Sequence, residues 1–493
     1  MQYLSTRGGF SASDSAAVLQ GLAPDGGLYI DPDLAGRPFD WQACLKLNAL
    51  GMAERILSHL LPGFENMGEL VRRAYAGKFE TEDLTPLVSV GEDFVLELFR
   101  GPTSAFKDVA LSMLPQLITA ARKQEGMKER IMILTATSGD TGKAALEGFH
   151  DVEGTHILVF YPDGGVSPVQ RAQMVTQAGQ NVKVCAVRGN FDDCQTGVKQ
   201  AFAAINQGGC LKDKAVRLSS ANSINIGRLA PQVVYYFIAY AKLLKCGRIA
   251  LGEPVNFSVP TGNFGDILAG YFAKLMGLPV GRLICASNAN NVLTDFISTG
   301  VYDKRRDFLR TSSPSMDILV SSNLERLLYL ASGGDSALVK ELMESLSRDG
   351  VYTLPEKPLA NIRSVFSGFC CDEAGTEAAI ARVWREQGYL CDTHTAVAFS
   401  AAWDYKRQSG GTNPMVVLST ASPYKFPAAV LRAIGGDTAG DEFEQMEKLR
   451  ALSGVPIPKG LQGLKEKAPL HSDVIDREDI LPYVLKQIDS LEV

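Results

Sequence analysis

The sequence lacks the residue patterns that mark metal sites and disulfide frameworks. Its 493 residues include nine cysteines but no Cys-x-x-Cys pair, and its five histidines show no metal-ligand spacing. The adjacent Cys370 and Cys371 are too constrained for an ordinary disulfide framework. We therefore expect no metal site, and reduced thiols in a cytoplasmic protein.

Strong positive charge and long apolar runs are also missing. The formal net charge is -6, which argues against nucleic-acid binding as the main activity. The first residues do not join a basic segment to an apolar one, so we expect no secretory signal. The most apolar stretch, 229–244, is interrupted by Gln232 and Lys242, which predicts a buried helix and no membrane partner.

What remains is the composition of an ordinary globular protein, with 46% hydrophobic and 21% charged residues. A chain of this length should divide into two or three domains. Strand and helix patterns alternate over 88–187, as in parallel α/β units. We predict an α/β fold with a mostly helical packing layer or lid over 1–85, the first part of a large domain over 86–130, a small α/β domain over 131–215, and the rest of the large domain over 216–493 with a helical insertion at about 290–366.

Lys107 is the residue whose sequence context most clearly indicates chemical reactivity. It lies in Gly-Pro-Thr-Ser-Ala-Phe-Lys-Asp (101–108), after an apolar strand pattern and before a helical one. Gly-Pro predicts a turn, and Thr103 or Ser104 could cap the helix. The positive end of the helix dipole should lower the pKa of the Lys107 amine, which suits a Schiff base with a carbonyl cofactor. The alternative is a solvated surface lysine.

A polar loop, Thr-Ser-Gly-Asp-Thr-Gly (137–142), follows the buried strand pattern 131–135. With Lys143 it resembles the end of a phosphate-binding P-loop, but Thr137 and Ala144 occupy positions where that motif needs Gly and Ser or Thr. Loop amides at a helix N-terminus still form an anion site. We interpret this loop as the cradle for a substrate carboxylate.

A second loop, Pro-Thr-Gly-Asn-Phe-Gly-Asp (260–266), follows the strand pattern 255–259 and opens a helix. Its two glycines allow the backbone to surround an anion, and a phosphate is the ligand that we favour. The polar strip 219–228, with Asn225 and Arg228, leads into the apolar helix. The residues of this strip could contact a ligand or only cap the loop, and the sequence favours neither role.

Together with Leu-Ser-Thr-Ala (418–421), these motifs resemble those of the threonine synthase family, pyridoxal 5'-phosphate (PLP) enzymes of fold type II related to the tryptophan synthase β-subunit. Residues 5–8, 21–28 and 313–318 resemble the longer bacterial and fungal members. The resemblance runs from about residue 3 to about residue 430. It implies parallel or mixed sheets flanked by helices, in two α/β domains plus a helical N-terminal region.

The resemblance also implies how PLP would be held. Lys107 would bind the cofactor as a Schiff base and then move protons. Thr420 would place a hydroxyl at the pyridine nitrogen, and Asp140 would lie where related enzymes place an asparagine near the phenolic oxygen. The cofactor phosphate would be surrounded by Gly262, Asn263, Phe264, Gly265 and Asp266.

The implied reaction is that of a lyase in threonine biosynthesis. O-phospho-L-homoserine and water would give L-threonine and phosphate by γ-elimination and β-hydration, with the released phosphate accepting a proton from water. Arg171 would hold the substrate phosphate, although an exposed helix arginine is an equal alternative. The full set of implied substrate ligands is Thr137, Ser138, Gly139, Thr141, Arg171, Asn225 and Arg228.

Other interpretations stay open. A phospholyase giving 2-oxobutyrate would keep the fold and the substrate, and a nucleotide-binding protein would use the Gly-x-x-Gly-Lys at 139–143. His394 invites an acid–base role, although a structural histidine upstream of a helix is favoured. We expect a monomer or weak homodimer.

Overall fold

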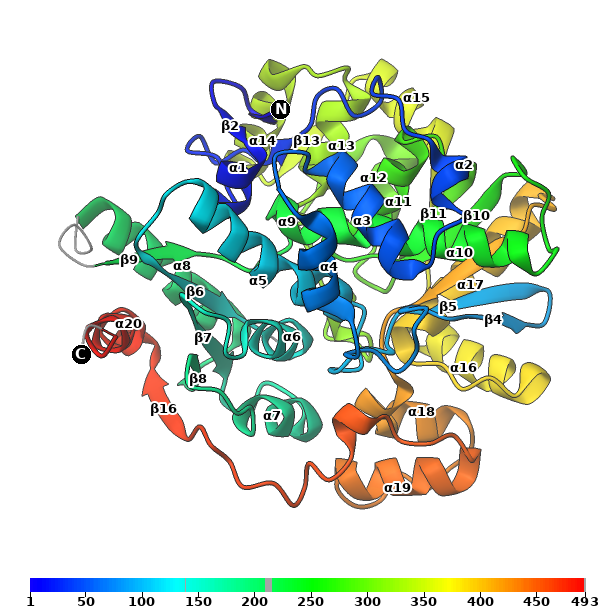
Figure 1. Ribbon diagram of the computed structural model, residues 1–493. Helices are drawn as coiled ribbons and strands as arrows, with labels where there is room; N and C mark the ends of the chain where they lie inside the picture. The colour runs from blue at the N-terminus through cyan, green and yellow to red at the C-terminus, as the bar shows by residue number, and fades with distance from the viewer. Residues whose placement is uncertain (138, 209–214, 492–493) are drawn as a thin grey trace.

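Two β-sheets, each covered by helices on both faces, organise the structure (Figure 1). The computed structural model describes residues 1–137, 139–208 and 215–491. Neighbouring strands within both sheets are parallel, except that β4 runs antiparallel to β5. The predicted α/β class is confirmed.

The first sheet has the strand order β14-β11-β10-β15-β5-β4. Its strands are β4 (Leu87–Val90), β5 (Asp93–Glu97), β10 (Val255–Pro260), β11 (Val280–Ser287), β14 (Phe366–Cys370) and β15 (Met415–Ser419). The second sheet has the order β16-β8-β7-β6-β9. Its strands are β6 (Arg130–Ala136), β7 (Thr155–Pro162), β8 (Val182–Arg188), β9 (Val216–Ser219) and β16 (Asp473–Asp476).

Helices connect and cover these strands. In chain order they are α1 (Asp14–Gln20), α2 (Trp41–Cys44), α3 (Ala49–Leu60), α4 (Met67–Tyr75), α5 (Lys107–Gln124), α6 (Asp140–Phe149), α7 (Pro168–Val175), α8 (Phe191–Gly208), α9 (Ile226–Leu229), α10 (Val233–Lys245), α11 (Gly265–Leu275), α12 (Val292–Thr299), α13 (Leu324–Ala331), α14 (Ser336–Arg348), α15 (Glu356–Val365), α16 (Glu373–Gln387), α17 (Thr393–Ser409), α18 (Pro427–Ala433), α19 (Glu442–Ser453) and α20 (Ile480–Asp489). Short 3-10 turns are η1 (Ala230–Gln232), η2 (Pro314–Met316), η3 (Pro423–Lys425), η4 (Lys459–Leu461) and η5 (Arg477–Asp479).

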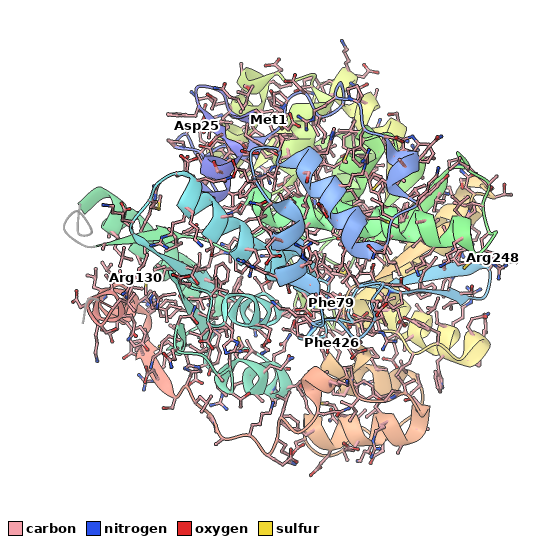
Figure 2. The ribbon with its side chains drawn as sticks, viewed as in Figure 1. Met1, Asp25, Phe79, Arg130, Arg248 and Phe426 are labelled. Carbon is pink, nitrogen blue, oxygen red and sulfur yellow. The ribbon has the colours of Figure 1, made fainter. Side chains whose placement is uncertain are left out.

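The central strands are buried on both faces, because successive side chains point to opposite sides of a sheet. In β11, Leu283 packs into the core on the side of α11, whereas Ile284 packs on the side of α17. One apolar cluster joins Leu283 through Leu111 of α5 to Ile133 of the second sheet. Side chains surround the ribbon of α5 (Figure 2), and this helix packs against α1, α4, α6 and α9.

The N-terminal region contains the helices α1 to α4 and also forms a small sheet. Its strands, in the order β2-β1-β3, are β2 (Ser11–Ser13), β1 (Gln2–Ser5) and β3 (Tyr29–Ile30). Helices α1 and α4 pack against α5, and α3 packs against α10. The region therefore supports the helix that begins at Lys107.

The predicted helix over 229–244 is divided into α9, η1 and α10, with Pro231 inside η1. Proline has no backbone N–H to continue an α-helix. The insertion near 290–366 is helical, but it also contains an antiparallel pair that the sequence did not indicate. This pair is β12 (Val301–Asp303) and β13 (Val351–Thr353).

The end of the chain differs from the predicted arrangement. We placed all of 216–493 with the first sheet, but β9 and β16 both belong to the second. Strand β16 pairs with β8, and α20 packs on α8 after an extended segment has crossed the molecule (Figure 1). A four-residue strand at a sheet edge has too short a pattern to be assigned to a sheet without its partner.

The contact between α5 and α6 gives a test of this packing. A Cβ added at Gly148 would lie 1.9 Å from the Leu111 carbonyl oxygen, so the two helices must separate to accommodate it. We expect Gly148→Ala to lower the free energy of unfolding by roughly 1–3 kcal/mol, measured by urea unfolding. Gly36→Ala is the control, because its nearest neighbour would be 3.7 Å away. Equal stability of the two variants would contradict the close contact.

Candidate active site

A cavity of about 400 Å³ lies where the carboxyl ends of strands from both sheets meet. Its walls include residues that follow β5, β6, β10 and β15, together with the turn η2. Ligands of open α/β sheets bind at this edge. The loops singled out in the sequence are therefore brought together, namely Lys107, Thr137, Asp140, Thr141, Arg228, Asn263, Phe264, Gly265, Asp266 and Thr420.

Lys107 is the first residue of α5, and its side chain is buried in the cavity wall. Its Nζ donates a hydrogen bond to Ser315 Oγ at 3.3 Å and lies 3.8 Å from Asp140 Oδ2. These contacts leave the nitrogen close to the cavity without a tight ion pair. The alternative of a solvated surface lysine is excluded.

The pKa of the Lys107 amine is lowered to about 8. Burial is the largest cause, because it disfavours the charged amine, and the charges of Arg228 and Lys425 act in the same direction. The carboxylates of Asp140 and Asp108 oppose the shift. A minor fraction of Lys107 is therefore neutral near physiological pH, which is far more than for a lysine with an ordinary pKa of about 10.4.

The turn before Lys107 is held differently from our prediction. Neither Thr103 nor Ser104 caps α5, whose N-cap Phe106 makes no side-chain cap. Instead, the Asp108 carboxylate accepts hydrogen bonds from the Thr103 amide at 2.8 Å and from its hydroxyl. Ser104 adopts a left-handed φ of 60°, and its Oγ has no hydrogen-bond partner among the described residues. The carboxylate at the second helical position therefore fixes the preceding turn against the start of α5 and caps no amide of the helix.

The loop 137–142 is closed by its first residue. Thr137 Oγ1 accepts hydrogen bonds from the amides of Gly139 at 3.0 Å and Gly142 at 2.8 Å. Gly139 has a φ of 137° and serves the turn, whereas Thr137, Asp140 and Thr141 line the cavity. Ser138 lies outside the described residues.

The loop 262–266 ends in the N-terminus of α11, whose first amides have no partners within the helix. Its backbone is fixed from behind: the Gly262 carbonyl accepts from Ser321 Oγ at 2.7 Å, and the Asn263 carbonyl accepts from the Asn323 backbone and side-chain nitrogens at 3.0 Å each. A Cβ at Gly262 would lie 2.6 Å from the Ser315 carbonyl oxygen. This arrangement suits a bound phosphate.

The side chain of Asp266 does not suit the role that we predicted for it beside the cofactor phosphate. Its carboxylate accepts hydrogen bonds from the hydroxyls of Tyr235 at 2.6 Å and Tyr236 at 3.1 Å, and burial raises its pKa to about 7. A carboxylate is also an acceptor, like phosphate. Only its backbone amide could contribute to a phosphate site.

Thr420 directly follows β15 and is buried in the cavity wall. Its carbonyl accepts a hydrogen bond from the Phe106 amide at 2.8 Å, which ties the end of β15 to the turn before Lys107. The hydroxyl is therefore held on the wall that also carries the lysine.

Arg171, predicted for the substrate phosphate, and the predicted substrate ligands Asn225 and Arg228 have different environments. Arg171 is exposed on α7 and does not line the cavity, so we do not retain it as a ligand. Asn225 caps α9 through the Gly227 amide at 2.9 Å and donates to the Val18 carbonyl, which uses its side chain structurally. Arg228 alone lines the cavity.

Arg228 is a buried cation that lacks a counter-ion. Its Nη1 donates to the Ala221 carbonyl at 2.8 Å, and no carboxylate lies within ion-pair distance in the described part of the chain. Burial lowers its pKa to about 10. An unpaired buried guanidinium favours an anionic ligand.

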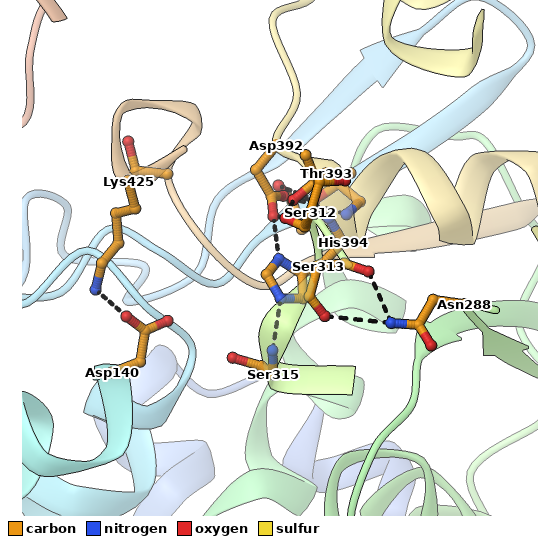
Figure 3. Close-up of polar contacts among 12 residues, drawn as sticks. Asp140, Asn288, Ser312, Ser313, Ser315, Asp392, Thr393, His394 and Lys425 are labelled. Atoms are coloured by element: carbon orange, nitrogen blue, oxygen red, sulfur yellow. Dashed lines mark hydrogen bonds and ion pairs between the residues drawn. The ribbon is translucent and has the colours of Figure 1, made fainter. Parts of the chain in front are cut away.

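His394 is a structural residue that holds the cavity wall, as Figure 3 shows. It lies inside α17, not upstream of it. Its Nδ1 is 2.7 Å from Asp392 Oδ2, and its Nε2 accepts the Ser315 amide hydrogen at 3.2 Å. Since Nε2 is an acceptor, the ring proton lies on Nδ1. The histidine thus positions Ser315 beside Lys107.

Sequence reasoning missed four residues near the site. Ser315 was inside the quoted motif 313–318, but its contact with Lys107 depends on the fold. Gln195 and Lys199 line the cavity from α8. Lys425 lies behind Asp140. Helical polar residues such as these carry no local signal of a site.

Comparison with known proteins places the chain in a family. The pattern described as "Threonine synthase N terminus" matches residues 2–75, "Pyridoxal-phosphate dependent enzyme" matches 83–421, and "Threonine synthase, C-terminal" matches 395–475. The chain belongs to the threonine synthase family. It is therefore a pyridoxal-phosphate-dependent enzyme of fold type II, as the motifs predicted.

Individual family members are similar over most of their length. The threonine synthase of Pseudomonas aeruginosa is 42% identical over 92% of this chain and 96% of its own. The PLP-bound threonine synthase structure from Brucella melitensis is 40% identical, with a TM-score of 0.87 over 99% of this chain and 98% of its own. The human protein threonine synthase-like 1 is 39% identical over 85% of this chain, which spans only 58% of that protein.

Two features are absent from the described residues. No helix there is long and apolar enough to cross a membrane. No group of three or more His, Cys, Asp or Glu side chains there could hold a metal ion.

The lowered pKa of Lys107 can be tested without the cofactor. We expect acetylation of Lys107 in the cofactor-free protein to rise with pH around a midpoint near 8, because only the neutral amine reacts. Ordinary lysines should titrate near about 10.4. Mass spectrometry of peptides labelled across neutral and alkaline pH gives both midpoints. A Lys107 midpoint as high as that of exposed lysines would contradict the effect of burial.

Proposed function

We propose that this chain is a threonine synthase that converts O-phospho-L-homoserine and water into L-threonine and phosphate. The observation that carries the proposal is one cavity that joins a buried, readily deprotonated lysine to two anion-binding groups, the α11 N-terminus and Arg228. A doubly anionic substrate and a phosphorylated cofactor need both. The Pseudomonas relative, nearly all of which is matched, supports the same activity.

The residues present fit the family's cofactor. Lys107 would bind PLP, the amides of 263–266 would hold its phosphate, and Thr420 would donate or accept at its ring nitrogen. Asp140, the first residue of α6, lies beside Lys107. When bound, PLP supplies an electron sink for negative charge that develops on the substrate carbon.

Lys107 is suited to move protons during the reaction. A general acid–base group works best when its pKa lies near the working pH, and that of Lys107 is lowered to about 8. Ser315 Oγ, at 3.3 Å, can accept from the amine in one state and donate to it in the other. Burial in the wall limits the exposure of this side chain to the cavity.

The two substrate anions would be bound by different elements of the cavity wall. The Thr141 hydroxyl and the amides at the start of α6 suit the substrate carboxylate. Arg228 replaces Arg171 as the ligand proposed for the substrate phosphate, because it is buried, unpaired and in the wall. Lys199 on α8 offers a second cation there.

Water addition needs a proton acceptor, and His394 is poorly placed to be one. Both of its ring nitrogens are engaged, one with Asp392 and the other with the Ser315 amide. The phosphate released from the substrate, retained near Arg228, is the acceptor we propose. A phospholyase that releases 2-oxobutyrate is the alternative outcome, and the names of the relatives do not favour it. Cytoplasmic location and a monomer or weak homodimer stay predictions.

The role of Lys107 is tested by Lys107→Ala. The variant should lose the visible absorbance of lysine-bound PLP, the adduct trapped by borohydride and threonine formation, because among the described residues no other lysine occupies the same position in the wall. Absorbance, peptide mass spectrometry after reduction and product analysis measure the three effects. A reducible adduct that persists on another lysine would refute the assignment.

The role of Arg228 is tested against a matched arginine. A charge-assisted hydrogen bond contributes roughly 1.5–3 kcal/mol, so Arg228→Gln should lower kcat/KM for O-phospho-L-homoserine by roughly ten- to a hundredfold or more. PLP content should be unchanged. The exposed Arg171→Gln should retain wild-type kinetics. The ratio of threonine to 2-oxobutyrate should fall in Arg228→Gln if phosphate retention serves hydration. The opposite pattern in the two variants would restore Arg171 as the ligand.

A further inference from the structure

A second buried lysine lies just behind the cavity wall. Lys425 ends the turn η3, and its side chain has 0% exposure. Its Nζ lies 2.6 Å from Asp140 Oδ1 and donates a hydrogen bond to the Thr103 carbonyl at 3.1 Å. Figure 3 shows this ion pair apart from the His394 contacts. A fully buried ammonium is strongly unfavourable unless it is paired in this way.

The pair joins the two sheets beside Lys107. Asp140 begins α6, which follows a strand of the second sheet, whereas Lys425 follows the last strand of the first sheet. Thr103 belongs to the turn that leads into Lys107. One ammonium group therefore fixes Asp140 relative to the turn that carries the cofactor lysine.

The two oxygens of Asp140 are used differently. Oδ1 accepts hydrogen bonds from Lys425 and from Gln170 Nε2 at 2.9 Å, whereas Oδ2 faces Lys107 Nζ at 3.8 Å. Burial alone would raise the pKa of Asp140, but Lys425 and then Lys107 hold it well below its usual range. The carboxylate is thus ionised and turned mainly toward Lys425.

From this geometry we propose that Lys425 is a positioning residue: it neutralises and orients Asp140 so that Lys107 gives up its proton readily. Without Lys425, the full charge of Asp140 would face Lys107 and hold it as an ammonium. The other charged groups near Lys107 are Arg228 and Asp108, and they would be unchanged. The inference rests on the proposed role of Lys107 as the cofactor lysine.

The test is Lys425→Met, which removes the positive charge and keeps most of the apolar side chain. PLP incorporation is followed by visible absorbance, and its midpoint pH should rise by about one unit or more. A shift of this size is expected when an uncompensated carboxylate lies within a few ångströms of an amine. The absorbance of the holoenzyme should shift along the pH axis in the same direction. Lys425→Arg, which keeps the charge, should shift much less.

Two further variants separate this role from a general loss of packing. Lys406 forms an ion pair with Asp93 and does not line the cavity, so Lys406→Met should leave the midpoint unchanged. The double variant Asp140→Asn with Lys425→Met replaces the buried pair by two uncharged side chains and should fold even if Lys425→Met does not. Its midpoint should return toward the wild-type value, because Lys107 then faces neither charge.

The outcomes are distinct. An unchanged midpoint in Lys425→Met, an equal shift in Lys406→Met, or a double variant that keeps a raised midpoint would each overturn the role of Lys425. A wild-type protein in which borohydride traps PLP on a residue other than Lys107 would instead overturn the proposed function.

Discussion

The burial of the Lys107 amine at the start of α5 is the constraint on which the rest of the site depends. Burial disfavours its charged form and makes the nitrogen a usable nucleophile and proton carrier. The neighbours of such an amine must hold it in place without forming a close ion pair between it and a carboxylate. The structure supplies this with Ser315 at hydrogen-bond distance and Asp140 at 3.8 Å.

Both sheets are needed to maintain that balance. The first sheet supplies the lysine turn, the α11 N-terminus and Thr420, and the second supplies the loop that carries Asp140. The ion pair between Lys425 and Asp140 crosses between them. Because one apolar cluster also runs from one sheet through α5 to the other, packing and charge both define the distance between the two walls.

Some polar side chains that look like catalytic groups have structural hydrogen bonds, whereas an arginine that looked like part of a capped loop is available for a ligand. His394 lines the cavity and Asn225 does not, but the hydrogen bonds of both side chains hold the backbone of neighbouring segments. Arg228, in contrast, is buried without a counter-ion among the described residues. The difference lies in how many hydrogen bonds each side chain already makes. A polar group whose donors and acceptors are all engaged cannot also bind a ligand.

The sequence by itself determined the α/β class, the family and the position of Lys107 at a strand-to-helix turn, because glycine turns, buried strand patterns and helix starts are local signals. It could not separate Arg171 from Arg228, since no local pattern shows which arginine is buried and only the fold buries one of them. Likewise, β16 joins the second sheet and Lys425 reaches Asp140 through long-range contacts. Burial and pairing between distant segments are properties of tertiary structure alone.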